Sequence, residues 1–483
     1  MSFNIRYFDI FDNEEKEIGI LPPRFVDDTL GDTISIENRV VIPSFIDAHA
    51  HILGSIVKSN WVNLFDIKSK QHLFDLIKEY SDRNKKVFIG YNFDESKWSD
   101  DKSYPTRKEL DAVSKDLNIF LMRIDGHLAV VNSKTIETFR IPKDVFYDFS
   151  NGIITEDYVY DIANKILKKY GQDLKEQTVL EFIKKGVLAA CDMGLDLSVP
   201  KTFIKKIKNH IDLYEYTILK SLEKVHESDI KKVLEKYGAK PQGIKLFVDG
   251  SLGARTAFLF EPYRDDPNNR GLLLISEESL ETIVKICNKL KIQLAIHAIG
   301  DAAIDITLRA LKHADINLRH RIEHLEMPLE DHVKKLSSYG IIPSMQPNFV
   351  ANWQQRGGLY ERRLGWDRAK NMNPFRTILE KRKILSFGSD CMPLDPLYGL
   401  YGAMTHPIEE EKLSFTDAVL SYTHGSAYSI FMENVLGKIA PGYDASFLIL
   451  NIDQNPSPDE VKKAKIVFIC RRGNILFNML PKI

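Results

Sequence analysis

The sequence predicts an α/β fold, namely a (β/α)8 TIM barrel with a small composite β-sandwich domain from both chain ends and an inserted α/β subdomain after strand 1. Three observations lead to this prediction. Strand-like apolar runs alternate with amphipathic helices along the middle of the chain, both ends are rich in short β-type runs, and one connection is far too long for a single βα unit.

Eight short apolar runs predict the strands of the barrel. Amphipathic helical patterns fit between most of them, for example over 277–291 and 302–313. This alternation is typical of a parallel barrel, which we expect to occupy residues 41–434. The predicted strands cover residues 41–47, 187–193, 213–219, 243–249, 292–297, 319–324, 340–346 and 384–389.

The two chain ends share a pattern of short β-type runs. At the N-terminal end these runs cover 4–11 and 33–51, and at the C-terminal end they cover 445–451 and 464–477. The last run contains Arg471-Arg472-Gly473-Asn474, which indicates a hairpin. We predict that residues 1–40 and 435–483 form one composite β-domain.

Residues 52–186 are too numerous for one βα connection. They contain strand-like runs at 86–93 and 118–124 and helical patterns near 70–82 and 158–170. We therefore predict a subdomain inserted between the first two barrel strands. Because it follows the C-terminal end of the first strand, it should overhang the face where barrel enzymes carry their active sites.

Composition narrows the range of partners and compartments. Lys and Arg number 66 against 67 Asp and Glu, so no strong global field attracts polyanions, and nucleic acid is not an expected partner. The sequence contains no run of 18 apolar residues, so a membrane span is not expected. The four scattered cysteines favour a reducing cytosol and a cytoplasmic protein over a disulfide framework. The expected partners are a small-molecule substrate and a second copy of the chain.

His49 and His51 close the first predicted strand. Residues i and i+2 of a strand point to the same side, so two imidazoles with this spacing can chelate one metal ion. The spacing alone is weak, because two unrelated core or surface histidines would look the same. The run from Pro43 to His51 strengthens it by placing polar groups, including Asp47, directly after an apolar strand.

Three later strands also end in potential metal ligands. His297, His324 and Asp390 each follow an apolar run and precede a polar loop. Each by itself could be a hydrogen-bonded cap of the strand end. Together with the first-strand pair they predict a metal centre, and several histidines with a carboxylate suit Zn²⁺.

Lys245 lies inside the predicted strand 243–249, where an unpaired ammonium is costly. Either it pairs with a carboxylate such as Asp249, or it is N-carboxylated and its carbamate bridges two metal ions. On strand 319–324, His320 is expected deep in the barrel as a core histidine. Arg321 and Glu323 should then face away from the interior, as an ion pair with the helical layer.

Four residues are candidates for substrate binding. Asp125 and His127 lie in the insert, where they could contact the substrate from a lid or form a buried turn network. Arg255 follows a glycine-rich loop and could bind a substrate anion or lock the loop. Trp353 follows the seventh strand and could line an apolar pocket.

These residues carry a resemblance to the amidohydrolase superfamily, and within it to the YtcJ-like (amidohydrolase-3) subgroup, over nearly the whole chain. Single elements such as the first-strand His pair are weak, but the combination is specific. The matching stretches are PSFIDAHAH (43–51), MRIDGHLAVVNS (122–133), GIKLFVDGSLGARTA (243–257), IHAIGDAAID (296–305), HRIEH (320–324), FGSDCMPLDP (387–396) and GKIAPGYDASFLIL (437–450).

The resemblance implies a role for each matching position. His49 and His51 look like ligands of the more buried metal, and His297 and His324 like ligands of the second. Lys245 looks like the bridging lysine, and Asp390 like the last-strand carboxylate that touches metal and nucleophilic water. The sequence departs from the family in a short N-terminal segment and in the run 423–427, Thr-His-Gly-Ser-Ala, where Asn-Pro-Ala or similar is expected.

The expected function is metal-dependent hydrolysis of a carbon–nitrogen bond of the non-peptide amide or N-formyl type, with Asp390 as general base for the attacking water. One or two divalent ions are expected, with Zn²⁺ first and N6-carboxylysine at Lys245 in the two-metal case. Two alternatives stay open, a one-metal deaminase of a nucleobase-like substrate and a non-catalytic regulatory barrel.

Overall fold

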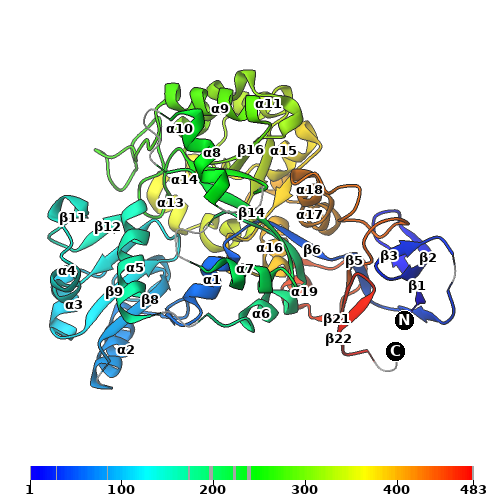
Figure 1. The fold of residues 1–483 in the computed structure, drawn as a ribbon, viewed down its shortest axis with the longest axis horizontal. Coiled ribbons are helices and arrows are strands. Elements are labelled where there is room, and N and C mark those ends of the chain that lie inside the picture. The colour runs from blue at the N-terminus through cyan, green and yellow to red at the C-terminus, as the bar shows by residue number, and fades with distance from the viewer. Residues whose placement is uncertain are drawn as a thin grey trace.

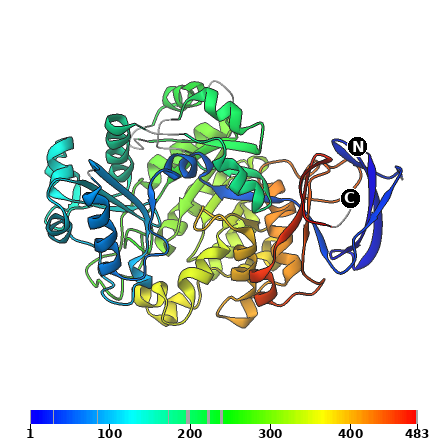
Figure 2. The same ribbon diagram turned by 90° about the horizontal axis from the view of Figure 1, so that it is seen from below.

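A computed structural model describes residues 2–28, 30–83, 85–171, 174–194, 199–220, 225–236 and 241–480. Three parts are visible in Figure 1: a central barrel, a cyan insert on one side and a blue-and-red β-domain on the other. The turned view in Figure 2 keeps the insert and the β-domain on opposite sides of the barrel. The predicted fold class is confirmed.

The barrel sheet consists of eight parallel strands in the order β6-β13-β14-β15-β16-β17-β18-β19. Most of their residues are buried, because helices cover one face and side chains fill the other. This is why the sequence shows apolar runs rather than strict alternation. The strands are β6 (Phe45–Ala50), β13 (Val187–Asp192), β14 (Asp212–Ile218), β15 (Gly243–Phe247), β16 (Gln293–Ala298), β17 (Arg321–His324), β18 (Ile342–Met345) and β19 (Ser386–Phe387).

Helices surround the barrel, and α9 (Glu277–Leu290) illustrates why they form. Ser276 caps its N-terminus by accepting a hydrogen bond from the backbone of Ser279. Leu280, Ile283 and Cys287 recur at helical spacing and are buried against the sheet. Other helices of this layer are α6 (Thr178–Lys184), α7 (Lys201–Ile207), α8 (Glu227–Lys236), α10 (Asp301–Ala310), α11 (Glu330–Ser338) and α15 (Phe375–Arg382).

The last strand meets the first at Gly388. A Cβ atom there would lie 2.3 Å from the backbone nitrogen of His49, so only glycine permits this approach. The Asp390 backbone donates to the carbonyl of His49 at 2.7 Å. The Ser389 backbone donates to the Asp47 carboxylate at 3.0 Å. These contacts bring the two ends of the sheet together and place Asp390 beside His49.

The β-domain is a sandwich of two four-stranded sheets, ordered β3-β2-β1-β4 and β22-β21-β20-β5. Its core contains Phe25, Val41 and Phe447. The predicted strand 41–47 is divided, because Val40–Pro43 pairs antiparallel with β20 and only the following β6 enters the barrel. The strands are β1 (Phe3–Asp9), β2 (Glu14–Leu21), β3 (Arg24–Val26), β4 (Thr33–Ser35), β5 (Val40–Pro43), β20 (Phe447–Leu450), β21 (Ile466–Arg471) and β22 (Asn474–Asn478).

The insert has its own sheet, ordered β11-β12-β10-β9-β8-β7, with clusters of buried apolar residues on its two faces. Its elements overlap both strands and both helices predicted for this segment. They are β7 (Val62–Asn63), α2 (Lys70–Asp82), β8 (Val87–Phe93), α3 (Arg107–Val113), β9 (Asn118–Arg123), β10 (Leu128–Val131), α4 (Ser133–Phe139), β11 (Phe146–Asp148), β12 (Ile153–Thr155) and α5 (Asp157–Tyr170). Over the described residues, no helix has the length and apolar character needed to cross a membrane.

Candidate metal centre

The six predicted ligand residues line one cavity at the C-terminal ends of the barrel strands. The cavity measures about 580 Å³ and lies between the barrel mouth and the insert. The residues come from five strands or the loops directly after them. They are His49, His51, Lys245, His297, His324 and Asp390.

His49, His51 and Asp390 form a compact group. Their potential ligand atoms all lie within 4.8 Å of one another. One Asp390 oxygen is 3.2 Å from Nε2 of His51 and 3.7 Å from Nε2 of His49. Burial alone would raise the pKa of Asp390, but the His51 hydrogen bond and the nearby side chains of His49, His51 and Lys245 lower it. The group therefore offers two imidazoles and an ionised carboxylate to one cation.

Glu323 orients the His49 ring. Its Oε2 atom is 2.6 Å from Nδ1 of His49, and both side chains are buried. Because a carboxylate only accepts, Nδ1 carries the proton and Nε2 is the free lone pair. Burial, and after it the positive charge of Lys245, lowers the pKa of His49, so the ring is neutral. Nε2 is buried without a hydrogen-bond partner among the described residues, as a metal ligand would be before the metal is added.

The predicted sides of strand β17 are wrong. Arg321 and Glu323 point into the barrel, where Arg321 donates to the carbonyl of Ala48 at 2.6 Å and to Ser344 Oγ at 2.9 Å. His320 is buried, as expected, but between the sheet and α9, where its Nδ1 accepts from the Leu294 backbone at 2.9 Å. The prediction had assumed that residues 320, 322 and 324 share one side of a regular strand, with His324 facing the interior.

His324 does not continue the regular strand. Its φ is +71°, a left-handed conformation, and Leu325 after it also has a positive φ. The side chain of His324 is thus turned toward the cavity independently of the alternation along Arg321–Glu323. Because the prediction took His324 as part of the regular strand, its positive φ reversed which β17 side chains were expected to face the barrel interior.

His297 and His324 lie side by side, with ring centroids 4.4 Å apart. Burial and neighbouring positive groups lower the pKa of both rings, which keeps them in the neutral form that binds metals. His297 Nε2 lies 3.0 Å from the carbonyl of Gly250, which fixes that ring. Within the described part of the chain, His324 Nδ1 is buried with no hydrogen-bond partner.

Lys245 does not pair with Asp249. Asp249 instead accepts hydrogen bonds from the backbones of Ile299, Gly300 and Phe258 at 2.8 to 3.0 Å. The Lys245 Nζ atom is buried 4.7 Å from the centroid of the Phe247 ring and has no hydrogen-bond partner among the described residues. Burial lowers the pKa of Lys245 to about 8, which favours the neutral amine. A neutral amine is the form that carboxylation requires.

The candidate substrate residues divide into two groups. Asp125, His127 and Trp353 line the cavities at the metal centre, whereas Arg255 is not among the described residues that do so. Arg255 forms a two-pronged ion pair with Asp265, at 2.8 and 3.1 Å, which favours its role as a lock on the loop.

His127 reaches the site from the insert. Its Nδ1 is 2.7 Å from a Glu156 oxygen, and its ring centroid is 5.2 Å from that of His297. Burial opposes protonation, but the Glu156 charge outweighs it and raises the pKa of His127 to about 9. Asp125 is held by Arg123 and Ser251, each at 2.6 Å. The insert thus presents a positively charged imidazole to the cavity.

A smaller cavity of about 20 Å³ opens beside the same residues. Both cavities are lined by His297, His324 and Asp390. Trp353 packs on Phe349 in its wall and donates through Nε1 to Asp94 at 3.0 Å. His297, His324 and Asp390 thus face both a narrow cavity and a wide one.

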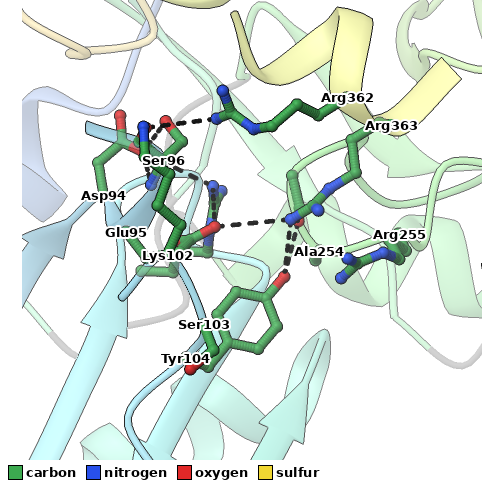
Figure 3. A network of polar contacts seen from close by, with 12 residues as sticks. Asp94, Glu95, Ser96, Lys102, Ser103, Tyr104, Ala254, Arg255, Arg362 and Arg363 are labelled. Carbon is green, nitrogen blue, oxygen red and sulfur yellow. Dashed lines mark hydrogen bonds and ion pairs between the residues drawn. The ribbon is translucent and has the colours of Figure 1, made fainter. Parts of the chain in front are cut away.

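A buried polar network joins the insert to the barrel (Figure 3). Arg363 donates to the carbonyl of Gly253 at 2.9 Å and lies 3.5 Å from Glu95 of the insert. Glu95 also accepts from Arg123 at 2.9 Å. The network keeps the insert over the barrel mouth.

Lys58 and Glu326 are two of the cavity residues that were not predicted from the sequence. Lys58 ends helix α1 (Ile52–Lys58), which follows the first-strand histidines, and Glu326 lies two residues after His324. Glu326 could have been predicted, because it is a carboxylate just past the end of a barrel strand. Lys58 could not have been predicted from the sequence, since a lysine at the C-terminal end of a helix is common.

Fold and site together define a metal-dependent hydrolase. A sequence model of the amidohydrolase family matches residues 32–477, and the chain belongs to this family. It is 29% identical over 459 residues to the putative amidohydrolase YtcJ of Bacillus subtilis, covering 87% of this chain and 85% of that protein. The YtcJ-like resemblance is thereby confirmed.

Two further relatives bear on chemistry. The crystal structure of an uncharacterized metal-dependent hydrolase from Pyrococcus furiosus superposes with a TM-score of 0.70 at 26% identity, covering 94% of this chain and 100% of that one. The N-substituted formamide deformylase of Arthrobacter pascens is 22% identical over 475 residues, covering 87% of this chain and 85% of that protein.

Proposed function

We propose that this protein hydrolyses a carbon–nitrogen bond in an amide with a small acyl group, of the N-formyl type, by attack of a metal-activated water. The observation that carries this proposal is a set of three buried ligand atoms in the cavity that Asp390 also lines, namely His49 Nε2, Lys245 Nζ and His324 Nδ1, which have no hydrogen-bond partner among the described residues. Buried polar atoms normally have hydrogen-bond partners, so three unsatisfied ligand atoms lining one cavity support a cation-binding site there.

The residues fit one or two divalent ions, most simply Zn²⁺. His49, His51 and Asp390 would hold one ion, His297 and His324 would hold the other, and a carboxylated Lys245 would supply oxygen ligands to them. Such ions supply a Lewis acid and a nucleophilic water at neutral pH. His49 is held in its binding orientation by Glu323.

Asp390 is placed to move the protons. Its lowered pKa keeps it ionised at neutral pH, so it can accept the proton of the attacking water and pass it to the leaving nitrogen. His127, whose pKa is raised to about 9, is placed to donate a hydrogen bond to the carbonyl oxygen as negative charge develops there.

The unequal cavities support a small acyl group. The reacting carbonyl carbon would lie where both cavities meet at His297, His324 and Asp390, with the acyl substituent toward the 20 Å³ side and the amine portion toward the 580 Å³ side. A hydrogen atom fits the narrow side without rearrangement. The formamide activity in the name of the Arthrobacter pascens relative agrees with this assignment.

Chelation followed by metal addition tests the proposal. Chelated protein should lose turnover of N-formyl amines and regain it with Zn²⁺, and N-acetyl analogues should react more slowly than N-formyl ones. Elemental analysis should find about two metal ions per chain, falling to about one in Lys245→Met. Full turnover after chelation would contradict the mechanism. A single ion with unmodified Lys245 would instead favour the one-metal deaminase.

A further inference from the structure

The wide cavity contains a cation that the proposed reaction does not use. Lys58 lies at the last residue of α1 and lines the cavity together with Asp390 and Cys391. No Asp or Glu among the described residues lies within ion-pair distance of its ammonium. Among the described residues, its Nζ faces the Tyr91 ring, 5.9 Å from the centroid.

Three carboxylates that line the cavity are already paired with other side chains. Glu156 pairs with His127 at 2.7 Å, and Asp125 accepts from Arg123 at 2.6 Å. Asp390 contacts His51 at 3.2 Å. Burial lowers the pKa of Lys58, and the nearest acidic groups, Cys391 and Asp390, oppose this only in part. A partly buried cation in this state is stabilised by any anion that enters the cavity.

Another part of the cavity lining is apolar. It is formed by Ile218 and Leu219 at the end of β14 and by Phe247, Leu272 and Leu274 around β15. The wall with Lys58 carries the polar atoms of Tyr91 and Asn92. A ligand that satisfies both walls has an apolar body and one anionic end.

We propose that Lys58 binds a carboxylate on the amine portion of the substrate, so that the protein acts on N-acylated amines that carry a carboxylate. This inference rests on the proposed function, since it assigns the amine portion to the wide cavity. The carboxylate would replace water at Lys58, gain a charge-assisted hydrogen bond, and hold the amide with its carbonyl near His297, His324 and Asp390.

Matched substrates test the preference. N-formylglycine and N-formyl-β-alanine are compared with their primary amides, which keep the shape and remove the charge. In the Zn²⁺-loaded wild type, kcat/KM for the better acid should exceed that for its amide by about tenfold, mostly through KM. This ratio should fall toward one in Lys58→Met and be partly kept in Lys58→Arg. Lys78→Met, an exposed lysine of α2, should keep the ratio.

A binding experiment separates this inference from the proposed function. Hexanoate and hexanamide are titrated into Zn²⁺-loaded protein by calorimetry, and Lys58→Met should weaken hexanoate binding by about tenfold while Lys78→Met should not. If no N-formyl compound is hydrolysed but this loss is found, the proposed reaction is wrong and the carboxylate site stands. If hexanoate binds Lys58→Met as tightly as wild type, the inference is overturned, whatever the hydrolysis assays show.

Discussion

Nδ1 of His49 lies 2.6 Å from Oε2 of Glu323, and both groups are enclosed within the barrel below the proposed metal site. Glu323 is held in turn by Arg321 at 2.8 and 3.0 Å. Arg321 is anchored to the carbonyl of Ala48, on the strand that carries His49. The ring is therefore oriented from below by a closed set of contacts between β6 and β17.

Replacing Glu323 should weaken metal binding without touching a ligand. Glu323→Gln keeps the size of the side chain but removes the charge that fixes the His49 tautomer, so Zn²⁺ affinity should fall about 10- to 100-fold. Competition with a fluorescent chelator measures it. Glu281→Gln, on the partly exposed surface of α9, is the control and should leave affinity unchanged. Wild-type affinity in Glu323→Gln would refute the orienting role.

Asp390→Asn tests the general base. With the proton acceptor removed, kcat should fall by about 10²- to 10⁴-fold. Metal content should stay largely intact, because His49 and His51 remain. Steady-state kinetics and elemental analysis on the same preparation check both statements. A kcat within a few-fold of wild type would mean that another group takes the proton.

Trp353→Leu should widen the small cavity and change acyl selectivity. The wall formed by Trp353 and Phe349 limits the space on the acyl side, so the ratio of kcat/KM for N-acetyl to N-formyl substrates should rise several-fold. Trp366→Leu is the matched control, since Trp366 is not among the described residues that line either cavity. An unchanged ratio would place the acyl group elsewhere.

His320 should make the fold sensitive to acid. Burial lowers its pKa from 6.5 to about 4, so the unfolded chain binds a proton more readily than the folded protein. Above pH 6.5 His320 is neutral in both states and does not lower the free energy of unfolding. As the pH falls from 6.5 toward 4, protonation of the unfolded chain lowers the free energy of unfolding by at most roughly 3 kcal/mol.

The measurement compares urea unfolding of the metal-free protein at several pH values. His320→Asn can still accept the Leu294 hydrogen bond but cannot titrate, so its unfolding free energy should fall less steeply between pH 6.5 and 4. The two proteins should differ in slope rather than only in offset. Equal slopes would mean that the buried ring is not the source of acid sensitivity.

The barrel was predictable because each of its strands and helices has a pattern that is contained within a short segment of the sequence. Each buried parallel strand is an apolar run, and each helix between them has its own cap and periodicity, as in α9. Candidate ligands such as His297 and Asp390 were visible because barrel enzymes carry their site residues at the C-terminal ends of strands. Their convergence on one cavity follows from that rule.

Other features depend on contacts that the local sequence does not encode. The inside and outside of β17 were inferred from His324, whose positive φ removes it from the alternation. The division of 41–47 into two strands depends on pairing with β20, some 400 residues later. Whether Lys58 has a counter-ion depends on what the insert and the barrel loops place around it.

The sequence by itself thus determined the fold class and the residue types available for a metal centre, because periodicity and strand-end position are properties of short segments. The tertiary structure alone decided which groups are left without partners. Glu323 binds one nitrogen of His49, and three backbone amides donate to Asp249. Among the described residues, Lys245 Nζ is left without a hydrogen-bond partner. The hydrogen-bond partner of a buried group depends on which donors and acceptors the folded chain brings within bonding distance, and these come from segments far apart in the sequence.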